Sequence, residues 1–575
     1  MQIRQLLSLV LALALASGCA RGGPDGPAPA VGIALTWQYS GEARVSEGSQ
    51  AMVVSGHPLA SEVGRDILKQ GGNAVDAAVA VGFALAVVHP EAGNIGGGGF
   101  MIIRDRVGQV QALDYRETAP GRATRDMYLD AAGEPTERSV TGHLAAGVPG
   151  AVAGLTEAHR RLGRLTLDAV IAPAIELARD GFEVDDYRSE SIAEDSARLA
   201  LFPASRASFL PDGKRPEPGS RLRQPDLAAT LESVRRAGAA GFYRGRVADL
   251  IVAEMQRGGG IISHADLAGY RAIWRAPITI AYRGHTIYSM PPASSGGVTM
   301  GQILNIMEGY APVPPFGSPA LLHREAEAMR RAFTDRNTYL GDPAFVRNPL
   351  DRLLSKEYAA RLRTEIAERA SPTPKFDPTG ESGASTTHYS VVDSEGNAVS
   401  TTTTLNNSYG SAVTVTGAGF LLNDEMDDFA TAPGKPNLYG LVQGEANAIA
   451  PGKRMLSAMT PSIVLDPSGQ LLLVVGTPGG PRIITMVYHV ISNVIDHRME
   501  LADAVTAPRM HHQALPDSLQ VELEGFSPAT LDSLRGRGHG IASRGYWGDV
   551  EAIMRTEDGW QGVSDPRRGG GGAGY

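Results

Sequence analysis

The chain has 575 residues, a formal net charge of -9, 43% hydrophobic residues and 20% charged residues. This composition is ordinary for a soluble globular protein, and the length predicts one large domain or two intertwined domains. The net negative charge argues against nucleic acid as a partner, because phosphate binding needs a basic face.

Cys19 is the only cysteine, so the rest of the chain has neither disulfides nor cysteine-ligated metals. The HExxH and GxSxG signatures of common hydrolases are also absent from the sequence. We therefore expect no metal and no cofactor.

The N-terminus has the pattern of an export signal. Arg4 precedes an apolar stretch from Leu6 to Ala16, which is too short to span a membrane and is followed by small residues. Cys19 lies directly behind this stretch and resembles the lipid-bearing cysteine of a bacterial lipobox. We interpret residues 1–19 as a lipoprotein-type signal and residues 20–45 as a flexible tether, which predicts an exported protein held at the periplasmic or envelope membrane by a lipid. An ordinary cleaved signal with an incidental cysteine is the alternative.

Two helices are predicted first in the folded part. His57 to Gln70 has helical apolar spacing and ends before Gly71-Gly72, a typical stop signal. Asn73 can cap a second helix that runs to about Val88. Because this second helix is apolar nearly all round, we expect it to be buried between other layers. The glycine-rich segment 93–100 then precedes a short strand.

The predicted secondary structure changes from mainly helical to mainly strand after residue 384. Helical stretches are predicted between about residues 150 and 260 and between 318 and 370, whereas β-branched runs alternate with turns beyond 384. This pattern predicts layered α and β structure. Residues 370–384 contain three prolines and almost no apolar residue, which is typical of an exposed linker that proteases cut.

A threonine-rich hairpin follows the linker. The first strand is predicted to run to about Val392, and the second from Ala398 to Thr404, around a turn centred on Glu395. Thr386 and Thr404 then lie opposite each other, with Cβ atoms about 4.5 to 5.5 Å apart. Threonine-rich strands are usually only strands, so this spacing alone does not indicate catalysis.

Three other motifs are candidates for chemistry. The segment 423–429 gathers four carboxylates; it suits a solvated turn, a calcium loop or a site for a substrate ammonium group. Arg116 has the opposite charge and could bind a carboxylate. Gly479-Gly480 could aim two backbone N–H groups at an oxyanion, or could form a plain turn. The glycine-rich segment 93–100 lacks the ending of a phosphate loop, so phosphate binding is discounted.

These motifs together resemble the γ-glutamyltranspeptidase family of N-terminal-nucleophile hydrolases. The resemblance covers about residues 51–575. It is carried by GGNAVDAAVA, GNIGGGGFM, DYRETAP, TTHYSVVDSEGNAVSTTTTLN, LLNDEMDDF, PGKPNLYGLV and APRMHHQ, in the family's order. It implies an αββα sandwich built from two subunits of one self-cleaved precursor. The cut falls between Ser385 and Thr386, leaving a large subunit of residues 46–385 and a small subunit of residues 386–575.

The resemblance also implies the functional residues. Thr386 becomes the nucleophile, its freed α-amine can serve as the base, and Thr404 hydrogen-bonds it. Gly479 and Gly480 would form the oxyanion hole, and Arg116 and Ser457 would bind the substrate's carboxylate. Asn406, Glu425 and Asp428 would bind its ammonium group. Tyr439 would be an aromatic gate over the site. The implied substrates are glutathione and other γ-glutamyl amides, with water, amino acids or peptides as acceptors.

One residue departs from the family pattern. The family often has two adjacent serines where this chain has Ser457-Ala458. Loss of one hydroxyl donor is expected to weaken carboxylate binding by about 0.5 to 3 kcal/mol. Two alternatives to the transpeptidase therefore stay open: a related cephalosporin or glutaryl acylase, and a non-catalytic envelope lipoprotein that binds amino acids or peptides.

The predicted lipid anchor can be tested on the mature N-terminus. Mass spectrometry of protein purified from membranes should show acyl chains on an N-terminal Cys19. A mature chain that begins elsewhere and carries no acyl group would refute the anchor.

Overall fold

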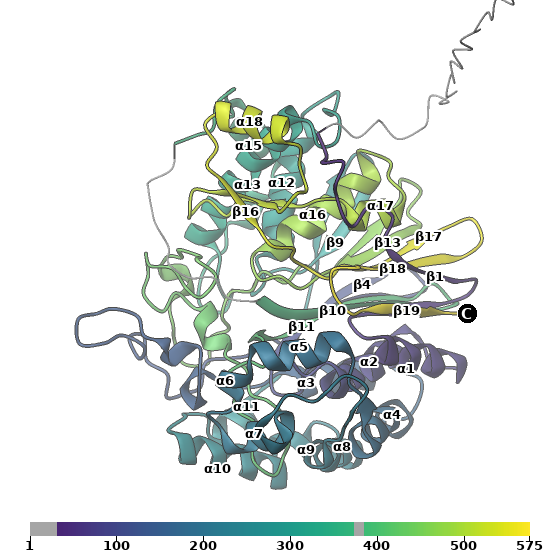
Figure 1. Cartoon of the computed structure of the whole chain (residues 1–575), viewed down its shortest axis with the longest axis vertical. Coiled ribbons are helices and arrows are strands. Elements are labelled where there is room, and N and C mark those ends of the chain that lie inside the picture. The colour runs from purple at the N-terminus through teal and green to yellow at the C-terminus, as the bar shows by residue number, and fades with distance from the viewer. Residues whose placement is uncertain (1–31, 373–383) are drawn as a thin grey trace, which may run out of the picture.

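The computed structural model describes residues 32–372 and 384–575. Two seven-stranded antiparallel sheets lie face to face, and helices cover the outer face of each (Figure 1). The predicted αββα sandwich is therefore confirmed. The core forms two main apolar clusters, one centred on the helices of the first sheet and one reaching from between the sheets to the helices of the second.

The first sheet carries the threonine-rich hairpin at its centre. In spatial order its strands are β19 (Gly571–Gly574), β2 (Met52–Ser55), β10 (Ala384–Val392), β11 (Ala398–Asn407), β3 (Gly98–Arg104), β4 (Val110–Asp114) and β7 (Ile273–Arg275). The second sheet contains β1 (Arg44–Gly48), β18 (Trp560–Ser564), β17 (Glu551–Arg555), β13 (Leu471–Gly476), β12 (Ser462–Leu465), β9 (His285–Ser289) and β8 (Ile278–Tyr282). Both sheets combine strands from before and after residue 386, so neither side of that position forms a core alone.

The helices divide between the two outer faces, as the lower and upper halves of Figure 1 show. The first sheet's side has α1 (Pro58–Lys69), α2 (Ala74–Val88), α3 (Ala151–Leu162), α4 (Leu167–Asp180), α5 (Asp186–Glu194), α6 (Ser196–Leu199), α7 (Pro203–Phe209), α8 (Pro225–Ala237), α9 (Ala240–Tyr243), α10 (Arg246–Gly258) and α11 (His264–Gly269). The second sheet's side has α12 (Gly296–Glu308), α13 (Pro319–Tyr339), α14 (Leu350–Leu353), α15 (Lys356–Thr364), α16 (Arg482–Ile495), α17 (Leu501–Thr506) and α18 (Pro528–Gly536). Short strands β5 (Phe182–Glu183), β6 (Arg221–Leu222), β14 (Met510–His511), β15 (Leu519–Glu522) and β16 (Ile541–Arg544) lie outside the two large sheets.

Helix α2 is the buried helix that the sequence predicts. All of its residues are buried, because it packs against β10 and β11 on one side and against α1, α3 and α4 on the other. Asn73 caps it in a capping box with Asp76. A helix with no polar face can exist in a water-soluble protein only in such a position.

The predicted tether over residues 20–45 does not extend to its full length. Ile33 forms a β-bridge with Phe526, and the Trp37 indole N–H donates to the carbonyl of Thr506 at 2.9 Å. The Trp37 side chain needs a partner for its N–H when it is buried, and this contact supplies one. Residues 32–45 thus pack on the body, whereas Cys19 and the signal lie outside the described residues.

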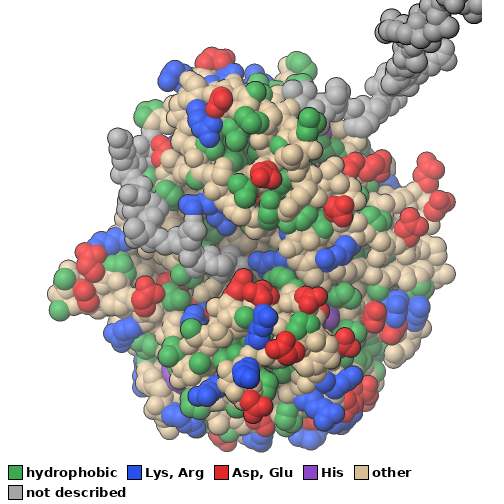
Figure 2. Space-filling model, viewed as in Figure 1, with side chains coloured by type: hydrophobic (Ala, Val, Ile, Leu, Met, Phe, Trp, Pro, Cys, Tyr) green, Lys and Arg blue, Asp and Glu red, His purple; other side chains and the backbone are tan. Residues whose placement is uncertain are grey.

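The molecular surface seen in Figure 2 carries acidic and basic side chains interspersed rather than gathered by sign. No helix within the described ranges is long and apolar enough to cross a membrane. Within those same ranges, no cluster of three or more His, Cys, Asp or Glu side chains is arranged to hold a metal ion.

Candidate active site

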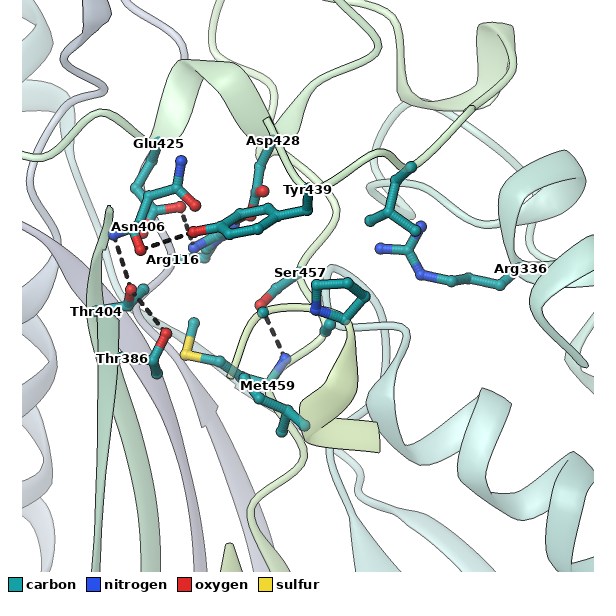
Figure 3. A pocket seen from close by; sticks show the side chains of 15 residues that line it. Arg116, Arg336, Thr386, Thr404, Asn406, Glu425, Asp428, Tyr439, Ser457 and Met459 are labelled. Atoms are coloured by element: carbon teal, nitrogen blue, oxygen red, sulfur yellow. Dashed lines mark hydrogen bonds and ion pairs between the residues drawn. The ribbon is translucent and has the colours of Figure 1, made fainter. Parts of the chain in front are cut away.

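Thr386 and Thr404 lie opposite each other on β10 and β11, as the hairpin spacing predicts. The Thr386 hydroxyl donates to the hydroxyl oxygen of Thr404 at 3.1 Å, and the backbone N–H of Asn406 donates to the same oxygen at 2.8 Å. Figure 3 shows the two threonines side by side at the edge of a cavity. The second contact orients the Thr404 hydroxyl, and the first joins it to Thr386.

The hairpin is held in place by its turn. One carboxylate oxygen of Asp393 accepts hydrogen bonds from the N–H groups of Glu395 and Asn397, and the other accepts from the N–H of Ala74 at the start of α2. The turn also places Gly396 at a φ of 80°, which glycine adopts without strain. The buried helix and the hairpin are therefore joined at one carboxylate.

The glycine-rich segment before β3 serves close packing. A Cβ at Gly97 would lie 2.1 Å from the carbonyl oxygen of Thr404, and one at Gly98 would lie 2.5 Å from that of Tyr115. Both distances are shorter than any real contact allows. Glycines here let the chain approach β11 and the segment that bears Arg116, which gives this motif a structural role.

Arg116 is fully buried and pairs with carboxylates from two segments. One guanidinium nitrogen lies 2.6 Å from Glu425 and 3.5 Å from Glu117, and another bonds Asp428. Glu425 and Asp428 belong to a short 3₁₀ turn, Glu425–Asp428. The predicted carboxylate-binding and ammonium-binding groups are therefore paired with each other.

Three carboxyl groups surround the Arg116 guanidinium, and burial shifts the balance between their charged and neutral forms. Burial raises the pKa of Glu117 to about 7, and burial likewise raises the pKa of Glu425 well above its usual value. Arg116 opposes both shifts, because a nearby cation favours the charged carboxylate. The cluster thus holds carboxyl groups that can receive a cation, such as an ammonium group, beside a guanidinium that can receive an anion.

Ser457 lies on the opposite wall. Its hydroxyl accepts from the N–H of Met459 at 3.1 Å, and its backbone bonds Ala293 and Ser295. Ala458 follows and also lines the cavity, so the methyl group that replaces the family's second hydroxyl faces the site. This wall therefore presents the Ser457 hydroxyl, and the Ala458 side chain beside it is apolar.

Gly479 and Gly480 form the turn into α16. Gly480 lines the cavity, and the two residues have φ values of 138° and 56°. Among the described residues, none accepts a hydrogen bond from either glycine's N–H. Two unengaged N–H groups beside a helix N-terminus can stabilise a developing negative charge.

Tyr439 crosses the mouth of the cavity (Figure 3). Its hydroxyl donates to the carbonyl of Asn406 at 2.8 Å, and the N–H of neighbouring Leu438 donates to Asp427 at 2.9 Å. Asn406 itself has a φ of 80°, which asparagine tolerates better than most residues. The cavity measures about 20 Å³, which is room for about one water, so a larger substrate requires lining side chains to move.

Sequence analysis missed Arg336, which lines the same cavity from α13. Its guanidinium donates to Ser295 at 3.0 Å and to Gln443 at 3.2 Å, and burial lowers its pKa to about 10. Gln443 and Asn447 were missed as well; both donate to the backbone carbonyl of Asp428. No sequence signal marks these residues, since an arginine within a long polar helix is usually exposed.

Comparison with known proteins agrees with this arrangement. The gamma-glutamyltranspeptidase family model matches residues 60–575. The glutathione hydrolase proenzyme of Escherichia coli (strain K12) is 46% identical over 570 residues, which cover 98% of this chain and 97% of that protein.

Two solved structures have the same fold. A cephalosporin acylase from Bacillus halodurans aligns with a TM-score of 0.81 at 29% identity, covering 92% of this chain and 97% of its own. The Helicobacter pylori gamma-glutamyltranspeptidase aligns with a TM-score of 0.55 at 45% identity, covering 56% of this chain and 93% of its own.

The sandwich with a threonine near the start of a central strand defines an enzyme of the N-terminal-nucleophile hydrolase class. Within that class, the chain belongs to the gamma-glutamyltranspeptidase family.

The Tyr439 contact predicts a measurable change in loop opening. Tyr439→Phe removes one hydrogen bond, which is expected to cost about 0.5 to 1.5 kcal/mol of loop closure. Amide hydrogen exchange in residues 433–444 should accelerate by about two- to tenfold, while exchange in α2 stays unchanged. Equal exchange in the loop of both proteins would show that the hydroxyl does not hold it closed.

Proposed function

We propose that this enzyme is a γ-glutamyltransferase with glutathione hydrolase activity. The observation that carries the proposal is the Thr386–Thr404 hydrogen bond at 3.1 Å in the same cavity as a buried arginine and two carboxylates. A nucleophile beside groups of both charges suits a substrate whose α-carbon bears a carboxylate and an ammonium group. Such a head group is what a γ-glutamyl compound presents.

The first step in the proposal is self-cleavage. The Thr386 hydroxyl oxygen attacks the carbonyl carbon of Ser385, and the peptide C–N bond breaks as the nitrogen takes a proton. The ester that results is opened by water, which leaves a carboxylate on Ser385 and a free amine on Thr386. The segment that ends at Ser385 then forms the large subunit, in which residues 32–45 pack with the predicted body of residues 46–385, and residues 386–575 form the small one. The two remain associated, because both sheets contain strands of each.

The mature Thr386 then acts on the donor. Its hydroxyl attacks the γ-carbonyl carbon, while its own α-amine, directly or through a water, accepts the proton. The N–H groups of Gly479 and Gly480 stabilise the oxyanion, and the amine departs with a proton; from glutathione this amine is cysteinylglycine. Water or an acceptor amino acid next attacks the γ-glutamyl ester and regenerates Thr386.

Donor binding exchanges one set of ion pairs for another. The donor's α-carboxylate binds Arg116 and Ser457, and its ammonium group binds Asn406, Glu425 and Asp428. The ion pairs between Arg116 and the two acids are thereby replaced by pairs with the substrate. A buried charge left without its partner is costly, so compounds that lack either half of the head group are disfavoured.

A related acylase is the second candidate function. The observation that favours it is Ala458, whose methyl group faces the cavity together with Met459 and Ile483. An apolar wall suits an acyl group without an α-ammonium. Glu425 and Asp428 favour the γ-glutamyl donor instead, because an acyl chain without an ammonium group gives them no new partner in exchange for Arg116. A non-catalytic binding lipoprotein is disfavoured by the positioned Thr386 hydroxyl.

We further propose that the enzyme is exported to the periplasm or cell envelope. The predicted signal in residues 1–19 supports export. Lipid attachment at Cys19 would hold the folded part at the membrane surface.

Replacement of the nucleophile tests cleavage and catalysis together. Thr386→Ala is expected to give a single uncleaved chain that releases no p-nitroaniline from its γ-glutamyl derivative. Thr401→Ala is the matched control, since Thr401 lies on the same hairpin and pairs with Tyr389 three positions further along β10. The control should yield two subunits, with the smaller beginning at Thr386. Processing and activity in Thr386→Ala would contradict the proposal.

Restoring the missing hydroxyl tests the donor head group. Ala458→Ser adds a hydrogen bond for the α-carboxylate, worth about 0.5 to 1.5 kcal/mol. The KM for γ-glutamyl p-nitroanilide should fall by about two- to tenfold. The glutaryl anilide, which lacks the α-amino acid head, serves as the control substrate and should gain nothing. A wild-type preference for the glutaryl compound would favour the acylase.

A further inference from the structure

A groove of about 800 Å³ lies in the outer helical layer of the first sheet. Residues of α3 and α9 and of the connection from α11 to β7 line it, in the lower half of Figure 1. None of its lining residues belongs to the cavity at Thr386. Its volume falls within the roughly 300 to 1,000 Å³ of typical ligand sites.

Two stacked tyrosines form part of the groove wall. The rings of Tyr243 and Tyr270 are 5.8 Å apart and nearly parallel, at 7°. Their hydroxyls are engaged inside the protein: Tyr243 donates to the carbonyl of Pro149 at 2.8 Å, and Tyr270 to that of Arg116 at 2.7 Å. Both side chains are buried, with only 7% and 6% of their surfaces exposed, so the pair forms a rigid floor, and alanine side chains of α3, α8, α9 and α11 line the groove beside it.

The rim of the groove is positively charged. Arg160, Arg244 and Arg271 are exposed lining residues, and Glu157 is the one acidic residue among the described residues that line it. Glu157 is occupied by Arg160 and by the indole N–H of Trp274. Among the described residues, the Arg244 guanidinium has no hydrogen bond or ion pair. A local excess of cations on a chain with a net charge of -9 selects an anion.

The groove backs onto the donor pocket. Tyr270 holds the backbone of Arg116 through its hydroxyl, and the carbonyl of Arg271 accepts from the Arg454 guanidinium at 2.7 Å. Arg454 lies three residues before Ser457. Tyr270 and Arg271, which are adjacent in the chain, therefore contact the segments of both Arg116 and Ser457, the two residues proposed to bind the donor's carboxylate.

We propose that this groove is a second binding site, for a small organic anion with an aromatic or apolar ring, whose occupancy restrains Tyr270 and so the backbone at Arg116. The ring packs on the apolar lining beside Tyr243 and Tyr270, and the anionic group binds Arg244 and Arg271. If the backbone at Arg116 is already held in place when the donor binds, less conformational entropy is lost on donor binding, and the affinity for the donor rises. Binding in the groove is independent of the proposed function, whereas its effect on donor affinity rests on it.

Direct titration tests the site. Mature two-subunit protein is titrated with 2-naphthalenesulfonate by calorimetry, with 2-naphthol as the uncharged probe. One saturable site is expected for the sulfonate, and about tenfold weaker binding for the naphthol. The double variant Arg244→Glu/Arg271→Glu should weaken sulfonate binding by about tenfold or more. Arg236→Glu is the matched control: Arg236 is exposed on α8, next to the groove, but does not line it.

Each result has a clear reading. Unchanged sulfonate binding in the double variant, or equal weakening in Arg236→Glu, overturns the site. With the sulfonate bound, the KM for γ-glutamyl p-nitroanilide should fall about twofold at constant kcat, and only in proteins that retain the arginines. A bound sulfonate with an unchanged KM overturns the link to Arg116. If the wild-type enzyme releases no p-nitroaniline, the proposed function fails, and the titration still decides the groove.

Discussion

The arrangement of the site depends on the pairing of β10 with β11. This register brings the Thr386 hydroxyl within 3.1 Å of the Thr404 hydroxyl and places Asn406 next to the acidic turn. Directly opposed residues are held by backbone hydrogen bonds on both sides, so the distance between the two hydroxyls is set by the sheet rather than by flexible side chains. A shift by one residue would turn Thr386 to the opposite face of the sheet.

The buried charges around Arg116 add a second constraint. Glu117 and Arg116 are neighbours in the chain, but Glu425 and Asp428 arrive from a segment more than 300 residues away. Each charge is buried and would be costly without the others. Pairing of these groups offsets part of the cost of their burial, and a zwitterionic head group offers partners of the same two signs.

Ser457 and Ala458 show how the same cavity relates to two chemistries. A serine hydroxyl and a methyl group stand where the family often has two hydroxyls, and the acylase structure shares the fold. Specificity between γ-glutamyl and simple acyl donors then depends on the unchanged charged cluster more than on the backbone. A substrate that leaves a buried polar group unpaired is rejected more strongly than one that only lacks a methylene group. Glu425 and Asp428 are therefore expected to contribute most to the preference between γ-glutamyl and simple acyl donors.

The sequence by itself determined layered α and β structure, the buried helix α2 and the opposition of Thr386 and Thr404, because these follow from apolar periodicity and from counting along a hairpin. Motif resemblance implied the αββα sandwich, Arg116, Glu425 and Asp428, and the gate Tyr439. Only the tertiary structure decided that Arg116 also pairs with Glu117, that the Tyr439 hydroxyl bonds the carbonyl of Asn406, and that Arg336 enters the cavity from α13. These contacts join segments far apart in the chain, and no local pattern encodes such distances. The short-range periodicity of apolar residues determines where helices and strands form. The packing of these elements determines which side chains come into contact.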